Sequence, residues 1–168
     1  DEDVLIPGEQ FEKCHELFLH NGMKQADPAA DIREAGEVPY YREGGALCIE
    51  LHKELFSSES AAYGELNAFF ADAFERKAWI QIGGVEVCTM CHTDHLLYLI
   101  FHAFKHFLHS GFGIRQVCDI VVYADTYGKE IDWDYVLEKC RSVHADVFAA
   151  SLFDIGEKHF GFDRKRAC

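Results

Sequence analysis

Short apolar runs separated by turn residues fill the first half of the chain, and this is the pattern of a small β-sheet. The runs predict strands at residues 2–6, 38–42, 46–52, 79–82 and 85–88. Glu43-Gly44-Gly45 and Gly83-Gly84 lie between neighbouring runs, where glycines supply the positive φ angles of tight turns. We therefore expect two β-hairpins after the first strand.

Two helices are expected among these strands. Apolar residues recur at helical spacing in residues 9–20, and Asn21-Gly22 follows them as a stop signal. A second periodic stretch, residues 60–77, predicts a helix whose buried stripe is Leu66, Phe69, Phe70 and Phe74. The small and polar residues 27–37 predict a loop.

From Thr93 onward the apolar positions follow a helical period. Helices are expected at residues 94–109, 114–124, 133–143 and 146–160; Asp132 is the N-cap of the third, and Ser110-Gly111 and Gly161 end the first and last. The chain is thus predicted to be an α+β protein. A small mixed β-sheet with flanking helices, residues 1–91, is expected to pack against a C-terminal helical bundle, residues 92–168.

Composition and charge narrow the class of protein. The chain has 168 residues, of which 49% are hydrophobic, and this supplies a core. It has neither a signal-peptide pattern at its start nor an apolar run that could span a bilayer, so we expect a cytoplasmic protein with no membrane partner. The formal net charge is −13 and the one sustained basic run is residues 164–166, which argues against an extended nucleic-acid partner. Seven scattered cysteines predict reduced, buried thiols.

Three carboxylates carry the candidate chemistry. Alternate residues of a strand share a face, so Asp1 and Asp3 point the same way. The same rule places Glu50 on one face with Cys48 and His52. If the two strands are neighbours, the three acids form a cage of hard oxygen ligands, which suits Mg²⁺ (or Mn²⁺).

Several segments together resemble a known family. Asp1-Glu2-Asp3-Val4-Leu5-Ile6, a helix ending at Gly22, and Cys48-Ile49-Glu50-Leu51-His52 are similar to the uncharacterised nucleotidyltransferase-like family of the DNA polymerase beta superfamily. The helix with His102 and His106 and the following Ile114-Arg115-Gln116-Val117-Cys118-Asp119 agree with it. The resemblance spans residues 1 to about 125 and implies a nucleotidyltransferase-like sheet in the first domain.

The resemblance also implies an activity: transfer of a nucleotidyl group from a nucleoside triphosphate to a small-molecule or protein acceptor. In that scheme Asp1 and Asp3 hold the metal ions that bind the triphosphate, and Glu50 is the third carboxylate, near the acceptor. The superfamily normally carries a Gly-Ser turn before the first Asp, whose amides hold the β and γ phosphates. No residue precedes Asp1 in this sequence, so we expect either a fragment that lacks this turn or a protein that does not hold a triphosphate in the usual manner.

The helix at residues 94–109 carries a stripe of histidines. His102, His106 and His109 each lie within about 40° of His95 around the helix, at about 100° per residue. His102 and His106 have the i, i+4 spacing of many metal ligands and are candidates for the cleft of the site, as is His52. The favoured interpretation is structural, with the histidines hydrogen-bonded to neighbours such as Asp119 and with Arg115 paired to Asp119 across one helical turn.

A second cysteine-histidine string needs its own interpretation. Cys88-Thr89-Met90-Cys91-His92 matches the motif for covalent haem attachment, but the chain has no export signal and haem is rejected. Zinc bound by Cys88, Cys91, His92 and His95 is disfavoured because no second Cys-x-x-Cys follows.

Two other functions remain open at this point. One is a catalytically inactive protein of the nucleotidyltransferase fold that binds a ligand or a partner. The other is a protein that binds a transition metal through the histidine stripe.

Overall fold

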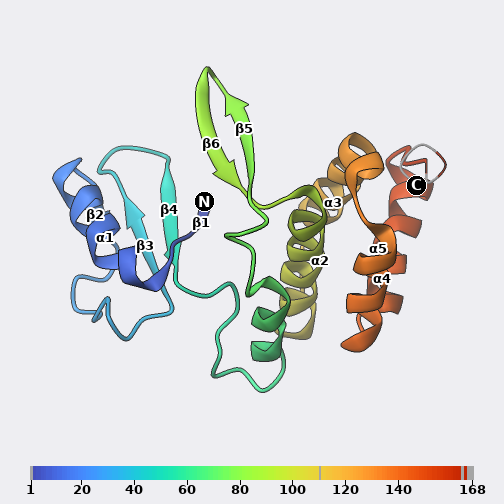
Figure 1. The fold of residues 1–168 in the computed structure, drawn as a ribbon, viewed down its shortest axis with the longest axis horizontal. Coiled ribbons are helices and arrows are strands. Elements are labelled where there is room, and N and C mark those ends of the chain that lie inside the picture. Colours follow the sequence, from blue (N-terminus) through green and yellow to red (C-terminus); the bar gives the residue numbers. More distant parts are fainter. Residues whose placement is uncertain (1, 110, 164, 166–168) are drawn as a thin grey trace. The chain divides into compact units, whose positions relative to one another are not determined.

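The computed structural model describes residues 2–109, 111–163 and 165 (Figure 1). Predictions that involve residues 1, 110, 164 and 166–168, namely Asp1 in the carboxylate cage, Ser110 at a helix end, most of the basic run and Cys168, lie outside the described residues. The chain forms two compact units, one ending at Asn67 and the other beginning at Ala68. The predicted domain boundary after residue 91 stays a prediction. Both sheets and helices are present, which confirms the α+β class.

The first unit contains a mixed sheet of four strands. They are β1 (Glu2–Leu5), β2 (Lys24–Gln25), β3 (Glu37–Tyr41) and β4 (Cys48–His52), in the order β1-β4-β3-β2. β1 pairs with β4 in parallel, and the β3–β4 and β2–β3 pairs are antiparallel. The predicted hairpin across Glu43-Gly44-Gly45 is confirmed. The two-residue strand β2 is too short to leave a periodic signal and was not predicted.

One face of this sheet is covered by a helix. The predicted helix of residues 9–20 begins with a 3₁₀ turn (Gly8–Gln10) and continues as α1 (Phe11–His20). The core between helix and sheet consists of buried Phe11, Met23, Val38, Tyr40 and Leu51. The Tyr40 hydroxyl, which is fully buried with its ring, lies 2.6 Å from Nδ1 of His15 on α1. Alternate residues of β3 and β4 therefore point into this core, and the residues between them point to the opposite face.

The prediction of a helix at residues 60–77 is wrong. This segment consists of turns around one 3₁₀ helix, η2 (Gly64–Phe70). The Asn67 side chain accepts from the backbone N–H of Phe56 at 3.1 Å and donates to the Phe56 carbonyl at 2.6 Å, so it holds η2 to the preceding loop. A Cβ at Gly64 would lie 2.8 Å from the Ser58 carbonyl oxygen, which shows how closely the two segments approach. These local contacts compete with a regular α-helix.

The predicted buried stripe of that segment is confirmed in part. Leu66 and Phe70 are buried, and Phe69 is half-buried. Phe74 was predicted to be buried but is 40% exposed, because the turns that follow η2 break the helical period on which the prediction depended.

The second unit begins with a two-stranded hairpin of β5 (Ala78–Ile82) and β6 (Val85–Thr89), as predicted. Gly83 and Gly84 at its turn have φ angles of 57° and 82°, which glycine adopts without strain.

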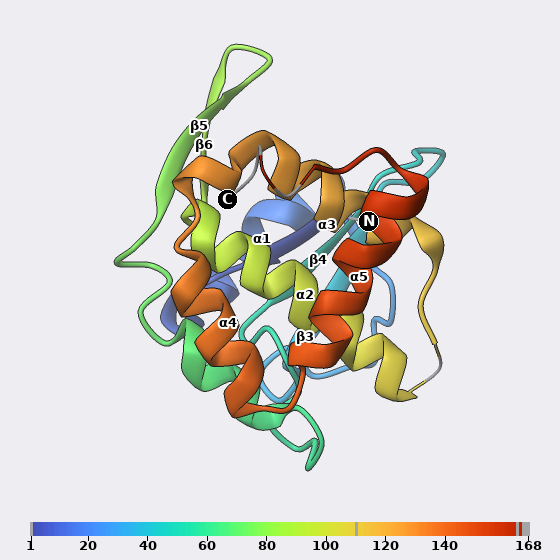
Figure 2. The same cartoon turned by 90° about the vertical axis from the view of Figure 1, so that its right-hand side faces the viewer.

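Four helices follow the hairpin: α2 (His92–His109), α3 (Ile114–Tyr127), α4 (Trp133–Ser142) and α5 (Asp146–His159), with a 3₁₀ turn, η3 (Gly128–Glu130), before α4. All four were predicted. Figure 2 shows α2 packed against α3 and α4, and α5 packed against the same two helices. Asp132 caps α4 by accepting from the backbone N–H of Tyr135 at 3.0 Å.

Two further sequence predictions concern membrane-spanning helices and the cysteines. Within the described ranges no helix combines the length and the apolar character needed to cross a bilayer. Six cysteines are described and all six are free thiols, as predicted. Their predicted burial is confirmed for Cys140 alone among the described six, and it is wrong for Cys88, which is exposed on β6 because the hairpin has only two strands.

Candidate metal centre

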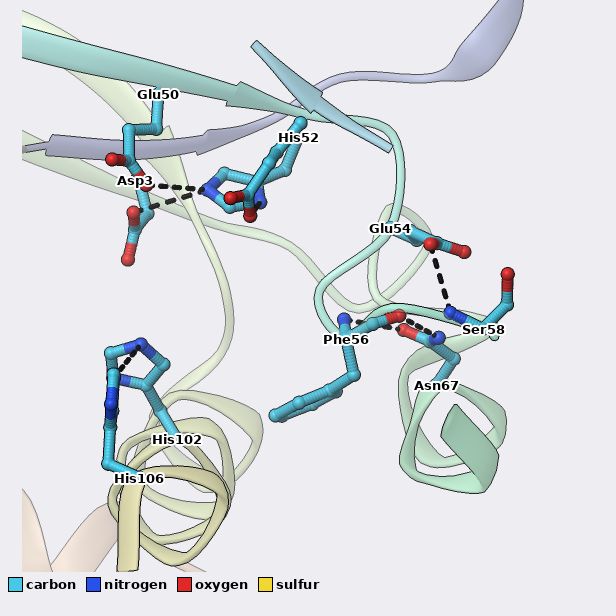
Figure 3. Close-up of polar contacts among 10 residues, drawn as sticks. Asp3, Glu50, His52, Glu54, Phe56, Ser58, Asn67, His102 and His106 are labelled. Carbon is cyan, nitrogen blue, oxygen red and sulfur yellow. Dashed lines mark hydrogen bonds and ion pairs between the residues drawn. The ribbon is translucent and has the colours of Figure 1, made fainter. Parts of the chain in front are cut away.

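The register of the first sheet brings Asp3, Glu50 and His52 together on the face opposite α1. β1 and β4 pair with Asp3 directly beside Glu50. His52 follows two residues after Glu50 on β4 and so lies on the same face. The three side chains converge in Figure 3. The sequence analysis assumed that the strands of Asp3 and Glu50 are neighbours, and the register shows that they are. Asp1 lies outside the described residues.

The donor atoms of these three side chains are close. Oδ1 of Asp3 lies 3.2 Å from Nε2 of His52, and Oε2 of Glu50 lies 3.6 Å from the same nitrogen. One donor atom from each of the three residues can be chosen so that all lie within 4.8 Å of one another. About one third of each carboxylate side chain is exposed, so both remain accessible from solvent.

His52 is the buried member of the centre. Its side chain is 6% exposed, and burial by itself lowers the pKa of the imidazole. The hydrogen bond to Asp3 and the charges of Asp3, Glu37 and Glu50 outweigh burial and raise the pKa of His52 above its usual value. When His52 is protonated, the imidazolium neutralises part of the charge of the two carboxylates.

This set of donors fits a divalent cation. Two carboxylates on adjacent strands repel each other unless a positive charge lies between them. Ligands at about 2.1 Å from an ion are separated by roughly 3–4 Å, so the 3.2 Å and 3.6 Å contacts need only small side-chain shifts. Oxygen and imidazole donors together suit Mg²⁺, Mn²⁺ and other first-row divalent ions.

The remaining predicted site residues belong to the second unit. His102 and His106 lie on α2 with their Nε2 atoms 3.2 Å apart, so one ring donates to the other. This bond agrees with the structural interpretation of the two histidines. Arg115 and Asp119 are both exposed on α3, and their predicted pairing stays a prediction.

The histidine and cysteine clusters do not form a second centre in the described part of the chain. There, Asp3, Glu50 and His52 are the one group of three or more His, Cys, Asp or Glu residues whose donor atoms converge. His92 instead bonds to the Tyr123 hydroxyl at 2.9 Å, and His95 stacks on the same tyrosine ring at 4.6 Å between centroids.

Sequence reasoning missed Glu37. This residue begins β3 and pairs directly with His52, and its Oε2 lies 3.5 Å from Nδ1 of the imidazole. It stands at the end of a polar stretch that the sequence predicted to be a loop. Its place in the alternation of β3, two residues before Pro39 and on the face opposite Val38, was the available signal.

An apolar cavity in the first unit is separate from this centre. It has a volume of about 480 Å³ and lies between the end of α1 and the β3–β4 turn. Its lining includes Leu17, Phe18, Met23 and Ile49. Ile49 is on the helix-covered side of the sheet, so the cavity and the carboxylates lie on opposite faces.

Comparison with known proteins identifies a family that the chain matches. The model of a family described as uncharacterised nucleotidyltransferase matches residues 1–161. The matched range includes the whole Asp3–Glu50–His52 centre and most of the helical unit. No curated protein and no solved structure matches the chain significantly.

Proposed function

The chain belongs to the uncharacterised nucleotidyltransferase family, and from this premise we propose that it transfers a nucleotidyl group from a nucleoside triphosphate to a small-molecule or protein acceptor. Membership supports nucleotidyltransferase chemistry in general. The observation that carries the specific proposal is the pairing of Asp3 with Glu50 on adjacent parallel strands, beside His52.

Asp3 and Glu50 would hold the divalent cation, Mg²⁺ or Mn²⁺, and His52 adds a nitrogen donor. Asp1 is proposed as a further carboxylate from the family pattern. When bound, the cation orients the triphosphate and stabilises the negative charge that develops as pyrophosphate leaves.

Glu50 is proposed as the acceptor of the proton. An acceptor hydroxyl attacks the α-phosphorus, a new O–P bond forms, and the bond from the α-phosphorus to the bridging oxygen of pyrophosphate breaks. The proton of the hydroxyl passes to the Glu50 carboxylate and then to solvent. About one third of the Glu50 side chain is exposed, so a proton taken from the acceptor hydroxyl can pass on to solvent.

The charge of the chain bears on the acceptor. A formal net charge of −13 disfavours binding of a long polyanion, so we propose a small molecule or a protein as acceptor. Nothing in the composition favours one of these two.

Two radioactive labels test the proposed reaction. The chain is incubated with Mg²⁺ or Mn²⁺, cell extract as the source of acceptors, and a triphosphate labelled at either the α or the γ phosphorus. We expect the α label in an acceptor product and the γ label in pyrophosphate. Transfer of the γ label to an acceptor, or no metal-dependent α transfer with any of the four common triphosphates, would contradict the proposal.

Matched variants connect the reaction to the site. Asp3→Asn and Glu50→Gln should each reduce transfer by about 10²–10³-fold, because each removes a charge that acts in the transition state. Glu2→Gln is the control, since Glu2 is exposed, adjacent in sequence to Asp3, and on the other face of β1. If triphosphate binds but none of the proteins transfers label, the family fold serves as a binding protein.

A further inference from the structure

We propose that Glu37 positions His52 so that its Nε2 atom is a ligand of the metal centre, and that the centre consequently prefers Mn²⁺ to Mg²⁺. The inference rests on the proposed function, because it concerns the same centre. It adds a positioning residue that the carboxylate pattern does not contain.

The β-sheet fixes Glu37 beside His52. The two residues are directly opposite in the antiparallel β3–β4 pair, and their side chains project from the face that carries Asp3 and Glu50. Directly opposed side chains have Cβ atoms about 4.5–5.5 Å apart, so their polar ends can meet. The observed separation of Glu37 Oε2 and His52 Nδ1 is 3.5 Å.

The Nδ1 atom of His52 needs such a partner. His52 is 5% exposed, and its Nδ1 is buried without a hydrogen-bond partner among the described residues. A buried N–H group without an acceptor costs about 1–3 kcal/mol. The Glu37 side chain is 60% exposed and so has room to rotate. A shift of its carboxylate by a few tenths of an ångström turns the 3.5 Å contact into a hydrogen bond.

A hydrogen bond at Nδ1 determines what Nε2 can do. If Nδ1–H donates to Glu37, the neutral imidazole has its lone pair on Nε2. Nε2 is the ring atom that faces Asp3 and Glu50, at 3.2 Å and 3.6 Å. A carboxylate bonded to the far nitrogen also raises the basicity of the ligating one and fixes the orientation of the ring.

The nitrogen ligand sets the preference for the ion. Mg²⁺ prefers oxygen ligands and is reluctant to lose its water. Imidazole favours first-row transition metals, so an Asp3, Glu50 and His52 donor set should bind Mn²⁺ more tightly than Mg²⁺. Without His52 as a ligand, the remaining carboxylates form an oxygen-only site.

Mn²⁺ binding to the full chain, without nucleotide and at one fixed pH, tests the inference. The paramagnetic resonance signal of free Mn²⁺ gives its Kd, and displacement by Mg²⁺ gives the selectivity. We expect Glu37→Ala to weaken Mn²⁺ binding about 10- to 100-fold. Glu37→Gln should restore much of the loss, because its amide oxygen still accepts from Nδ1–H. His52→Ala should abolish the Mn²⁺ preference.

A control and a spectroscopic signature separate positioning from a general effect. Glu16→Ala on α1 removes the same charge from an exposed position and should bind Mn²⁺ as the unaltered chain does. In the protein loaded with diamagnetic Zn²⁺, the Nδ1 proton of His52 should give a slowly exchanging proton resonance. That resonance should be lost in Glu37→Ala and retained in Glu37→Gln.

Two results would overturn the inference: Mn²⁺ binding in Glu37→Ala equal to that of the unaltered chain, or an unchanged Mn²⁺-to-Mg²⁺ selectivity in His52→Ala. Either result leaves the proposed function standing if label transfer still depends on Asp3 and Glu50. Conversely, Mn²⁺ binding that depends on Glu37 in a chain that transfers no label would contradict the function alone.

Discussion

Asp94 is a carboxylate that the second unit removes entirely from solvent. It lies in the first turn of α2 and is 0% exposed, with Oδ1 3.1 Å from Nη2 of Arg76. Burial raises the pKa of Asp94 and outweighs the opposing charge of Arg76, while Asp72 raises it further. The Cys91 side chain adds a hydrogen bond to the carboxyl group and, like Arg76, opposes the rise of its pKa.

This raised pKa predicts how stability changes with pH. The folded chain keeps a proton on Asp94 at pH values where the unfolded chain, with a pKa near 3.8, has lost it. The stabilisation from this proton is therefore complete below the unfolded pKa and is lost as pH rises through the folded pKa. In urea unfolding, the unaltered chain should lose stability relative to Asp94→Asn as pH rises from about 4 toward neutral.

Asp72→Asn is the matched control for Asp94→Asn. Asp72 is the other carboxylate on Arg76, at 3.0 Å, and it is half in solvent. Its replacement perturbs the same guanidinium without removing the buried carboxyl, so the pH trend should persist. The account would be contradicted if the free energy of unfolding of the unaltered chain minus that of Asp94→Asn stayed constant or increased as pH rises.

At the same scale, the centre shows what strand parity can and cannot predict. Alternation along a strand correctly placed Glu50 and His52 on one face, and the register confirms it. Parity does not reveal which strands are neighbours, because that depends on the β1–β4 crossover. Glu37 was missed for another reason: the hairpin of β3 and β4 was predicted, but its first strand was predicted to begin at residue 38, so Glu37 was assigned to the preceding loop.

At the scale of elements, Gly156 marks a close contact between α5 and α3. A Cβ at this position would lie 2.6 Å from Cγ2 of Val121 and 3.4 Å from Cβ of Phe162. Both neighbours are buried, and the β-branched valine has few alternative rotamers in a helix. The glycine is therefore required by packing, although it lowers helix propensity.

The contact predicts the effect of Gly156→Ala. Alanine favours a helix by about 0.5–1 kcal/mol, but overpacking costs about 1–3 kcal/mol, so we expect a net loss of roughly 1–2 kcal/mol in the free energy of unfolding. Adding Val121→Ala should make the double variant more stable than the sum of the two single effects. Chemical denaturation measures all three.

Gly113→Ala is the control for this contact. A Cβ at Gly113 meets no atom within 4 Å, and its φ of −92° suits any residue. It should cost less than about 1 kcal/mol, the penalty of alanine at an N-cap. A stability gain in Gly156→Ala, or additive effects with Val121→Ala, would show that α5 shifts without cost.

Helices and strands were predicted correctly where apolar residues recur at a regular spacing over a long segment. The four helices of the second unit and the two hairpins carry repeated apolar positions and glycine stops, and each was found near its observed bounds. Residues 60–77 failed because the Asn67 side chain bonds to Phe56, eleven residues earlier. No period within the segment records such a contact.

At the scale of the whole molecule, charge determines which partners can approach. With a formal net charge of −13, long polyanions are repelled unless a basic patch compensates. We expect a labelled single-stranded RNA or DNA to bind with a Kd weaker than about 10⁻⁴ M at roughly 0.15 M salt. Fluorescence anisotropy measures this, and tight binding that weakens steeply with added salt would contradict it.

At the same scale, the contacts divide the chain into two units after Asn67. The domain boundary near residue 92, which the change from strand to helical periodicity suggests, stays a prediction. The β5–β6 hairpin belongs by its contacts to the helical unit, although its periodicity is that of a sheet. Periodicity reports the type of each element and not the element against which it packs.

Calorimetric titration of nucleoside triphosphate into the full chain tests the central claim most directly. With Mg²⁺ or Mn²⁺ present, we predict saturable binding, and EDTA should abolish it. Asp3→Asn and Glu50→Gln should each weaken the binding by at least about tenfold, whereas Glu2→Gln should leave it unchanged. Binding that is independent of metal, or equal in all four proteins, would contradict a metal centre at Asp3 and Glu50.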